Sequence, residues 1–446
     1  MEFVFDGLKL TGEALLRMAL NPFYYIGLIG VALLYRRQTL LERKLFFVRL
    51  HRMAGQFFRS LGWGTLLGLF LSFVSAGFGL MLSFDALLWV WGVTLVLLLV
   101  RVRFASFVYA AIVLGLLQLV IERIPQLQDV QGLSPVITSL LDIHLPSLFA
   151  LAAVVLLAEA VLIRITGKKD ATPLYLEGKR GKVVGAYELQ GLWVMPLFLV
   201  VPAGFGGNVE MASLLWPMFF GGDAWQAGWS LLAFPVIVGY SAITASTYPE
   251  RKAKRAAGWL VLCAVVAGAA SVCAELWPLA AIGAVVATLV LREGWSLYSD
   301  RREQSQSPVF VHERRGLKVL DVMSGSPAAE MGIVRGETVV KANGVPVSTK
   351  EELHAALRTN SAFCKLEIVN LEGHNRFEHR ALYDGEHHGL GLVLCPDDSV
   401  QHAEKWRPLT LLSLLRPIRR GKASLVSPPT IVEADNPTAS SPSIEA

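Results

Sequence analysis

The chain of 446 residues is 53% hydrophobic and 17% charged, with a mean hydropathy of +0.49. This composition excludes an ordinary soluble protein. The formal net charge of +5 is modest and spread over loops, which favours an integral membrane protein with a basic cytoplasmic face over a nucleic-acid binder. The four cysteines form no Cys-X-X-Cys motif and indicate no disulfide framework. The first residues do not resemble a signal peptide, because the Lys/Arg cluster follows the first apolar run.

Nine apolar segments are candidates for crossing a bilayer, whose hydrocarbon core takes about 18 consecutive apolar residues or more. Their approximate bounds are 18–35, 61–84, 86–100, 104–121, 145–163, 189–205, 228–246, 258–274 and 276–291. The sequence therefore predicts an α-helical polytopic membrane domain over residues 1–299. Asn21-Pro22 interrupts the first segment, which leaves open a count of eight spans with that segment lying in the interface.

The loops between these segments alternate in their content of Lys and Arg. Loops 36–60, 101–103, 164–188 and 247–257 are basic, and the loops between them hold few such residues or none. Because basic loops stay on the cytoplasmic side, this alternation predicts that the chain after the last span is cytoplasmic. The N-terminus lies outside with nine spans and inside with eight.

Glu159 is the notable acidic residue within a predicted span. An ionisable residue in a membrane is by default a candidate functional group, for example in transport. The alternative is structural, either an ion pair with Arg164 one turn away or a packing polar group. A coupled transporter would usually show several such residues or broken helices in matching halves, so the sequence favours the structural role.

After the last span, the chain divides into a polar linker at 300–315, a compact module at 316–398, and a basic segment with a tail of disordered composition at 399–446. The elements expected in the module are strand 316–322, a short helix from Pro327, strand 338–342, an Asn343-Gly344 turn, a short piece at 345–347, a helix within 348–358 with a capping box from Ser348 to Glu351, strand 364–371, a hairpin at 375–384 and a closing segment at 387–395.

This order of elements resembles a bacterial PDZ domain, most specifically over residues 325–347. The resemblance implies a small α+β fold that binds a peptide carboxylate through backbone N–H groups of a GLGF-type loop and adds the peptide to a strand edge. In many PDZ domains that loop comes first, whereas here it comes last, so the strand order looks circularly permuted. The implied peptide-binding residues are Gly389, Leu390, Gly391 and Leu392 of the loop, Val393 and Leu394 of the strand edge, and Lys350, Leu353 and Leu357 of the facing helix.

The alternative is that the Gly-Leu-Gly-Leu segment simply packs on the core, with Leu353 and Leu357 buried. Catalytic patterns are not convincing anywhere in the sequence. The His312-Glu313 pair lacks the second histidine of a His-Glu-X-X-His zinc site, and no Walker A or dinucleotide-binding glycine loop occurs. The sequence therefore predicts no catalytic residue, no metal site and no cofactor.

A multi-span domain with basic cytoplasmic loops, followed by a module ending in Gly-Leu-Gly-Leu, resembles the MinJ family of cell-division topological determinants; the opening run Ala-Leu-Asn-Pro-Phe-Tyr-Tyr-Ile-Gly-Leu is also similar. The resemblance implies a non-enzymatic scaffold in the lipid bilayer, enriched at cell poles and septum. It would bridge a DivIVA-like polar scaffold to the MinD-like ATPase of the MinC–MinD inhibitor and contact other divisome membrane proteins. Two other classes stay open: a regulator of a membrane protease, and a transporter-like protein with an accessory PDZ domain.

Overall fold

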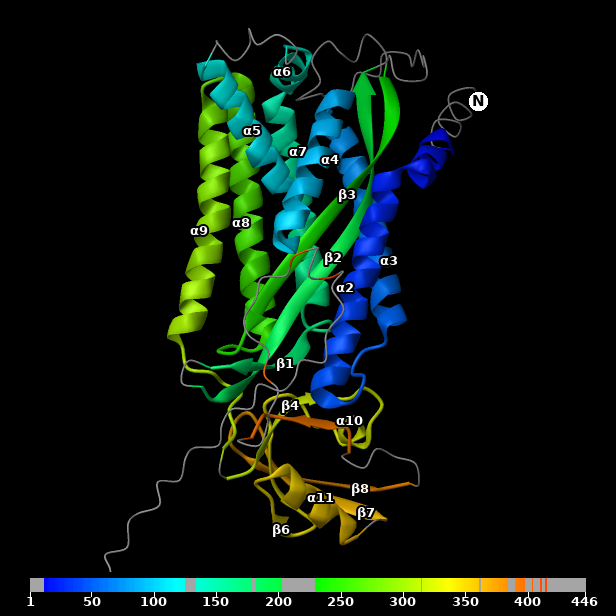
Figure 1. Cartoon of the computed structure of the whole chain (residues 1–446), viewed down its shortest axis with the longest axis vertical. Coiled ribbons are helices and arrows are strands. Elements are labelled where there is room, and N and C mark those ends of the chain that lie inside the picture. Colours follow the sequence, from blue (N-terminus) through cyan, green and yellow to red (C-terminus); the bar gives the residue numbers. More distant parts are fainter. Residues whose placement is uncertain are drawn as a thin grey trace, which may run out of the picture.

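The computed structural model describes residues 12–124, 134–178, 181–202, 229–313, 315–360, 362–383 and 390–397, together with 403, 410 and 414. An N-terminal domain of upright helices and a long hairpin ends near Ser305, and a smaller C-terminal domain begins at Gly316. The C-terminal domain lies at one end of the helices (Figure 1).

Most of the described helices of the N-terminal domain overlap the predicted apolar segments, although several extend beyond them and α6 lies in a predicted loop. The helices after Asn21 are α2 (Pro22–Phe46), α3 (Met53–Gly77), α4 (Phe84–Val100), the 3-10 helix η1 (Val102–Ala105), α5 (Phe107–Arg123), α6 (Ser134–Leu141), α7 (Leu145–Thr166), α8 (Pro249–Leu276) and α9 (Ala280–Ser305). Among the described residues, α3, α7, α8 and α9 are long and apolar enough to cross a membrane. The predicted count of eight or nine helical spans is not confirmed.

The interruption predicted at Asn21-Pro22 is confirmed. Helix Gly12–Leu20 and α2 meet there at a bend of 59°, and together they make a possible fifth span. Proline occupies the first turn of α2, where its missing N–H costs nothing, and the Asn21 side chain accepts a hydrogen bond from Phe23 N at 3.0 Å.

Two of the nine predicted helical spans are wrong, because the described parts of segments 189–205 and 228–246 are almost entirely strand. They are the core of β2 (Val183–Pro202) and β3 (Trp229–Thr244), which pair antiparallel, with β1 (Thr172–Glu177) on the other side of β2. Hydropathy cannot separate a buried strand from a buried helix. The β-branched residues and the interior prolines, Pro196 and Pro235, are the features that favour extended backbone here.

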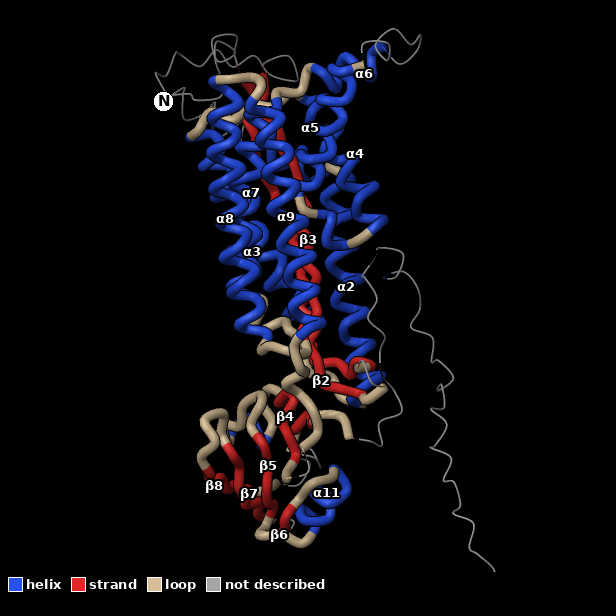
Figure 2. The backbone as a smooth tube through the Cα atoms, turned by 90° about the vertical axis from the view of Figure 1, so that its left-hand side faces the viewer, coloured by secondary structure: helices blue, strands red, loops and turns tan. Residues whose placement is uncertain are grey.

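The β2–β3 hairpin runs lengthwise among the helices of the N-terminal domain (Figures 1 and 2). A strand edge inside a membrane would normally be excluded, because its backbone groups have no water to bond. Pro196 and Pro235 face each other across the hairpin and lack N–H groups, which removes two donors from this buried stretch. The carbonyl of Pro235 accepts a hydrogen bond from Trp91 Nε1 of α4 at 3.1 Å.

Helix α3 covers the outer edge of β2 with a stripe of small residues at intervals of four. The Ser60 hydroxyl donates to Leu192 O at 2.7 Å, and Ser72 Oγ accepts from Phe198 N at 2.8 Å. Between them lie Gly64 and Gly68, where a Cβ atom would come within 2.5 Å of Val194 O and 2.6 Å of Pro196 O. Helix and strand backbones therefore touch directly, and polar groups of the strand edge are satisfied by the helix.

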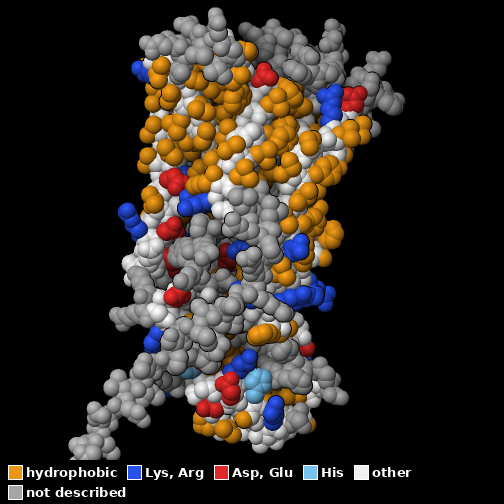
Figure 3. Space-filling model, viewed as in Figure 1, with side chains coloured by type: hydrophobic (Ala, Val, Ile, Leu, Met, Phe, Trp, Pro, Cys, Tyr) orange, Lys and Arg blue, Asp and Glu red, His pale blue; other side chains and the backbone are white. Residues whose placement is uncertain are grey.

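Helix α7 lies in the interior of the domain, since 72% of its most apolar window is buried. A helix that is apolar on all sides is expected to be buried on all sides. Hydrophobic side chains cover most of the visible face of the N-terminal domain at the end away from the C-terminal domain, and charged side chains gather nearer to that domain (Figure 3). Both features are those of a protein embedded in a bilayer.

The C-terminal domain has the predicted elements in the predicted order, except that residues 375–381 form a single strand paired with strand Phe363–Val369, where a hairpin at 375–384 was predicted. The elements are β4 (Leu317–Val322), α10 (Pro327–Glu330), β5 (Thr338–Ala342), β6 (Val345–Pro346), α11 (Lys350–Arg358), β7 (Phe363–Val369), β8 (Asn375–Ala381) and β9 (Leu392–Leu394). Their sheet runs in the order β8-β7-β5-β4-β9, with β6 beside β5. The last strand of the domain therefore lies next to the first.

Two details of this part of the chain differ from the prediction. The capping box of α11 joins Thr349 and Glu352, one residue later than predicted, because both pairs satisfy the same sequence pattern. Residues 300–315 are not a free linker, since α9 continues through Ser305 and the Phe310 side chain is fully buried. Of the predicted basic segment, Leu414 is described and is buried in a cluster with residues of α2, α4, η1 and the β2–β3 hairpin.

Candidate functional site

The predicted carboxylate loop lies at the start of β9, against the N-terminus of α10. Leu390 and Gly391 both have left-handed backbone, with φ of 57° and 76°. Any Cβ at position 391 would overlap the Ser326 side chain, so only glycine fits there. Backbone bonds hold the loop in place, from Ala328 N to Leu390 O at 3.0 Å and from Met323 N to Gly391 O at 2.9 Å. Gly389, the first predicted residue of the loop, lies outside the described residues.

The structure brings the loop and helix α11 together on one apolar core. Leu390, Leu353 and Leu357 belong to the same buried cluster, and Leu392 and Leu394 pack against it. Leu353 and Leu357 are 2% and 7% exposed, as the structural alternative expected. Lys350, at the first turn of α11, is exposed.

Strand β9 lies at an edge of the sheet. It is the last strand in the sheet order and pairs with β4 on one side. An extended peptide can add to such an edge through main-chain hydrogen bonds. His354, which was not predicted, lies four residues after Lys350 on the same side of α11 and is half-buried. The four-residue spacing from Lys350 was the available signal for it.

Residues missed by the sequence reasoning join the two domains next to the C-terminus of α7. Arg335 makes an ion pair with Asp321 at 2.8 Å and donates to Lys168 O at 3.3 Å. His51 contacts Glu42 Oε1 at 2.7 Å and Lys169 O at 3.1 Å. Two cationic groups thus meet carbonyl oxygens just past the helix end, where the helix dipole favours positive charge.

The surroundings of His51 favour its protonated form. Burial by itself would lower the pKa of His51, but the hydrogen bond to Glu42 and the charge of its carboxylate outweigh burial and raise that pKa above its ordinary value. Both ring nitrogens face acceptors, which is the arrangement that an imidazolium requires.

Glu159 pairs with Arg292 of α9, not with Arg164. The carboxylate lies 2.5 Å from the Arg292 guanidinium and accepts a hydrogen bond from the Ser106 hydroxyl at 2.6 Å. Glu159 is fully buried and Arg292 is 9% exposed. The sequence missed this pair because the two residues lie 133 positions apart. The finding agrees with a structural role for Glu159.

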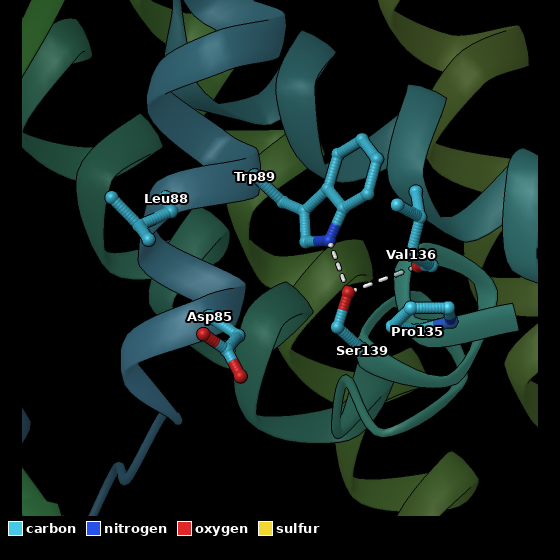
Figure 4. A pocket seen from close by; sticks show the side chains of 6 residues that line it. All are labelled: Asp85, Leu88, Trp89, Pro135, Val136 and Ser139. Carbon is cyan, nitrogen blue, oxygen red and sulfur yellow. Dashed lines mark hydrogen bonds between the residues drawn. The ribbon is translucent and has the colours of Figure 1, made fainter. Parts of the chain in front are cut away.

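Two cavities in the N-terminal domain lie outside the predicted site. An open pocket of about 460 Å³ is lined by α4 and α6 residues, and Trp89 Nε1 donates to Ser139 Oγ at 3.1 Å across it (Figure 4). A second, of about 130 Å³, includes Arg103, Tyr240 and Arg292 in its lining. Within the described residues, no group of three or more His, Cys, Asp or Glu side chains could hold a metal ion.

Known proteins and family models resemble both the C-terminal domain and the longer chain. Residues 318–369 match the family model of the PDZ domain. The chain is 32% identical over 265 residues to the cell division topological determinant MinJ of Bacillus subtilis (strain 168), covering 58% of this chain. It is 25% identical over 368 residues to probable cell division topological determinants MinJ of Lacticaseibacillus paracasei and Lacticaseibacillus casei (strain BD-II), covering 80% of this chain and 91% of those proteins.

The match to the Bacillus subtilis relative spans 64% of that protein's own length, slightly under two thirds. No solved structure matches the chain significantly. The PDZ match and the alignments over most of the chain agree with the resemblance found from the sequence. The chain is a MinJ-like protein, similar to the cell division topological determinants of that name and carrying a PDZ domain.

Proposed function

We propose that this protein is a non-enzymatic membrane scaffold that positions cell-division proteins. The observation that carries the proposal is the alignment with relatives named cell division topological determinants, which extends over 80% of the chain and so includes the membrane domain. The PDZ match supports protein binding as the mode of action. Tethering to a membrane raises the effective concentration of partners, so modest affinities are sufficient.

In the proposed arrangement, residues 1–299 form the multi-span domain and residues 316–398 a cytoplasmic PDZ domain of circularly permuted strand order. The position of β9 beside β4 supports the permutation, because the strand that carries the carboxylate loop comes last in the chain. The basic ends of the helices nearest the PDZ domain support the cytoplasmic side. The proposed peptide-binding residues are the loop and edge from Gly389 to Leu394, with Lys350, Leu353 and Leu357 of α11.

The proposed partners are a DivIVA-like polar scaffold and a MinD-like ATPase, which the protein would bridge to bring the MinC–MinD inhibitor to poles and septum. Other divisome membrane proteins are further proposed partners. The support is the name of the relatives together with a domain plan of one membrane platform and one binding module.

A fluorescent fusion of the full chain is expected to collect at septa and poles in dividing cells. The pattern should be lost in cells that lack the polar scaffold, because the scaffold would supply the positional signal. Fluorescence microscopy of both strains tests the proposal. An even distribution around the envelope of dividing wild-type cells would overturn it.

Substitution Gly391→Glu is expected to weaken capture of the division partners by about tenfold or more, because the side chain overlaps Ser326 and distorts the loop. Pull-downs from membranes, with equal amounts of inserted protein, measure the effect. The matched control is Gly373→Glu, which adds the same charge at another left-handed glycine, φ 88°, in open space. A second site variant, Lys350→Glu, tests the contribution of α11 to partner binding. Its exposed position leaves the core undisturbed. Unchanged capture by both site variants would exclude this groove as the contact.

A further inference from the structure

The back of the β4–β9 pair packs on the membrane domain. Leu320 of β4 and Val393 and Cys395 of the β9 segment are 0%, 5% and 6% exposed, and they belong to the buried cluster of the membrane domain. At Gly185 of β2, a Cβ would lie 2.8 Å from Leu320 Cδ1, so the strand backbone contacts the PDZ domain directly. The binding strand is therefore held between the PDZ core on one face and the membrane domain on the other.

The membrane domain also reaches the outer edge of β9. Gly391 O and Cys395 N bond to β4 residues, at 2.9 Å each. Since backbone direction alternates along a strand, the polar groups of Leu392 and Leu394 point to the opposite side, where a peptide strand would add. The Tyr175 hydroxyl of β1 donates to Leu394 O at 3.0 Å. One of the acceptors that an incoming peptide would use is thus already bonded within the chain.

A second set of contacts fixes the PDZ domain in this position. Arg335, in the turn before β5, lies over the Tyr187 ring at 5.4 Å and bonds to Lys168 O. The adjacent Gly336 approaches Tyr248, whose hydroxyl would lie 2.5 Å from a Cβ at that position. The docked arrangement therefore rests on apolar burial, a cation–π contact and hydrogen bonds at several points.

We propose that the membrane domain is an intramolecular competitor for the β9 edge, so that a peptide carboxylate binds fully only after Tyr175 releases Leu394. The inference rests on the proposed peptide-binding function and adds its regulation. Docking weakens peptide binding by the same factor by which a bound peptide weakens docking, as thermodynamic linkage requires.

The test measures the rate at which the Cys395 thiol is labelled in the full-length chain in detergent micelles. This measurement requires no known ligand. Cys395 is buried at the domain contact, and burial raises the pKa of its thiol to about 12, so it should react slowly with N-ethylmaleimide. Tyr175→Phe removes one hydrogen bond and should speed labelling of Cys395 by about 3- to 10-fold. Cys364, buried in the PDZ core, should stay unreactive and reports that the domain remains folded.

The matched control is Tyr25→Phe, which removes a hydroxyl bonded to Ala19 O at 2.6 Å, in helix α2 of the membrane domain. It should leave the labelling of Cys395 unchanged. If Tyr175→Phe also leaves it unchanged, the docking contact carries no energy and the inference fails.

A second arm uses a library of random hexapeptides with free C-terminal carboxylates. The tightest peptide selected on the wild-type chain should bind Tyr175→Phe about 3- to 10-fold more tightly, and in excess it should speed Cys395 labelling of the wild type. Equal affinities for the two proteins would overturn the inference and leave the proposed function intact. Failure of both proteins to retain any peptide would contradict peptide binding itself, and the labelling result would still report on docking.

Discussion

Replacement of Gly68 by leucine is expected to destabilise the membrane domain by about 3 kcal/mol, at the upper end of typical overpacking effects. A Cβ at this position would lie 2.6 Å from Pro196 O and 2.9 Å from Pro196 N. Both neighbours are backbone atoms of a paired strand, so neither can rotate away. Helix α3 would have to move outward, which would lengthen the hydrogen bonds from Ser60 and Ser72 to β2.

Thermal or denaturant unfolding of the purified chain in detergent, followed by tryptophan fluorescence, measures this loss. Gly62→Leu is the matched control, because Gly62 lies on the same helix and a Cβ there meets nothing within 4 Å. Hydrogen exchange at Phe198, whose amide is bonded to Ser72, should also be faster in Gly68→Leu alone. Equal stability of the two variants would mean that α3 and β2 do not approach this closely.

The membrane domain was predictable in its helices but not in its hairpin. Apolar runs, with Asn21-Pro22 as a break, locate α2, α3, α4, α5, α7, α8 and α9, although α2 and α9 continue for about ten residues or more beyond their predicted segments. The segments around Pro196 and Pro235 have the same hydropathy as a helical span. What makes them strands is pairing with each other and contact with the small-residue stripe of α3, which lies more than 100 residues earlier in the chain. Periodicity does not report such contacts.

The PDZ domain was predictable because its signals are local. Ser326-Pro327 and Asn343-Gly344 each act within four residues and mark a helix start and a turn where the structure has them, whereas the capping box of α11 lies one residue later than predicted. In the predicted carboxylate loop, Gly391 has left-handed backbone, which a glycine adopts readily. The hydrogen bond from Tyr175 to Leu394 O of β9 was not predictable, because a hydroxyl on a distant strand leaves no pattern near β9 in the sequence.

The ion-pair partner of Glu159 was also not predictable from the sequence. A nearby charge in sequence, Arg164, was the available partner, whereas the structure pairs the carboxylate with Arg292 from another helix. Replacing Glu159 by leucine is expected to destabilise the chain by about 3–5 kcal/mol, because it leaves a buried guanidinium without its counter-charge. The Ser106 hydroxyl, 2.6 Å from the carboxylate, would lose its acceptor as well.

The double variant Glu159→Leu with Arg292→Met separates a structural role from a transport role. Removing both charges together leaves no unpaired ion, so the stability should return to within about 1–2 kcal/mol of the wild type, as a double-mutant cycle would measure. For a purely structural pair, this variant should also keep the localisation of the wild type. A double variant that is stable and inserts normally but fails to localise would instead give the buried carboxylate a function of its own. Loss of localisation could then not be explained by loss of folding.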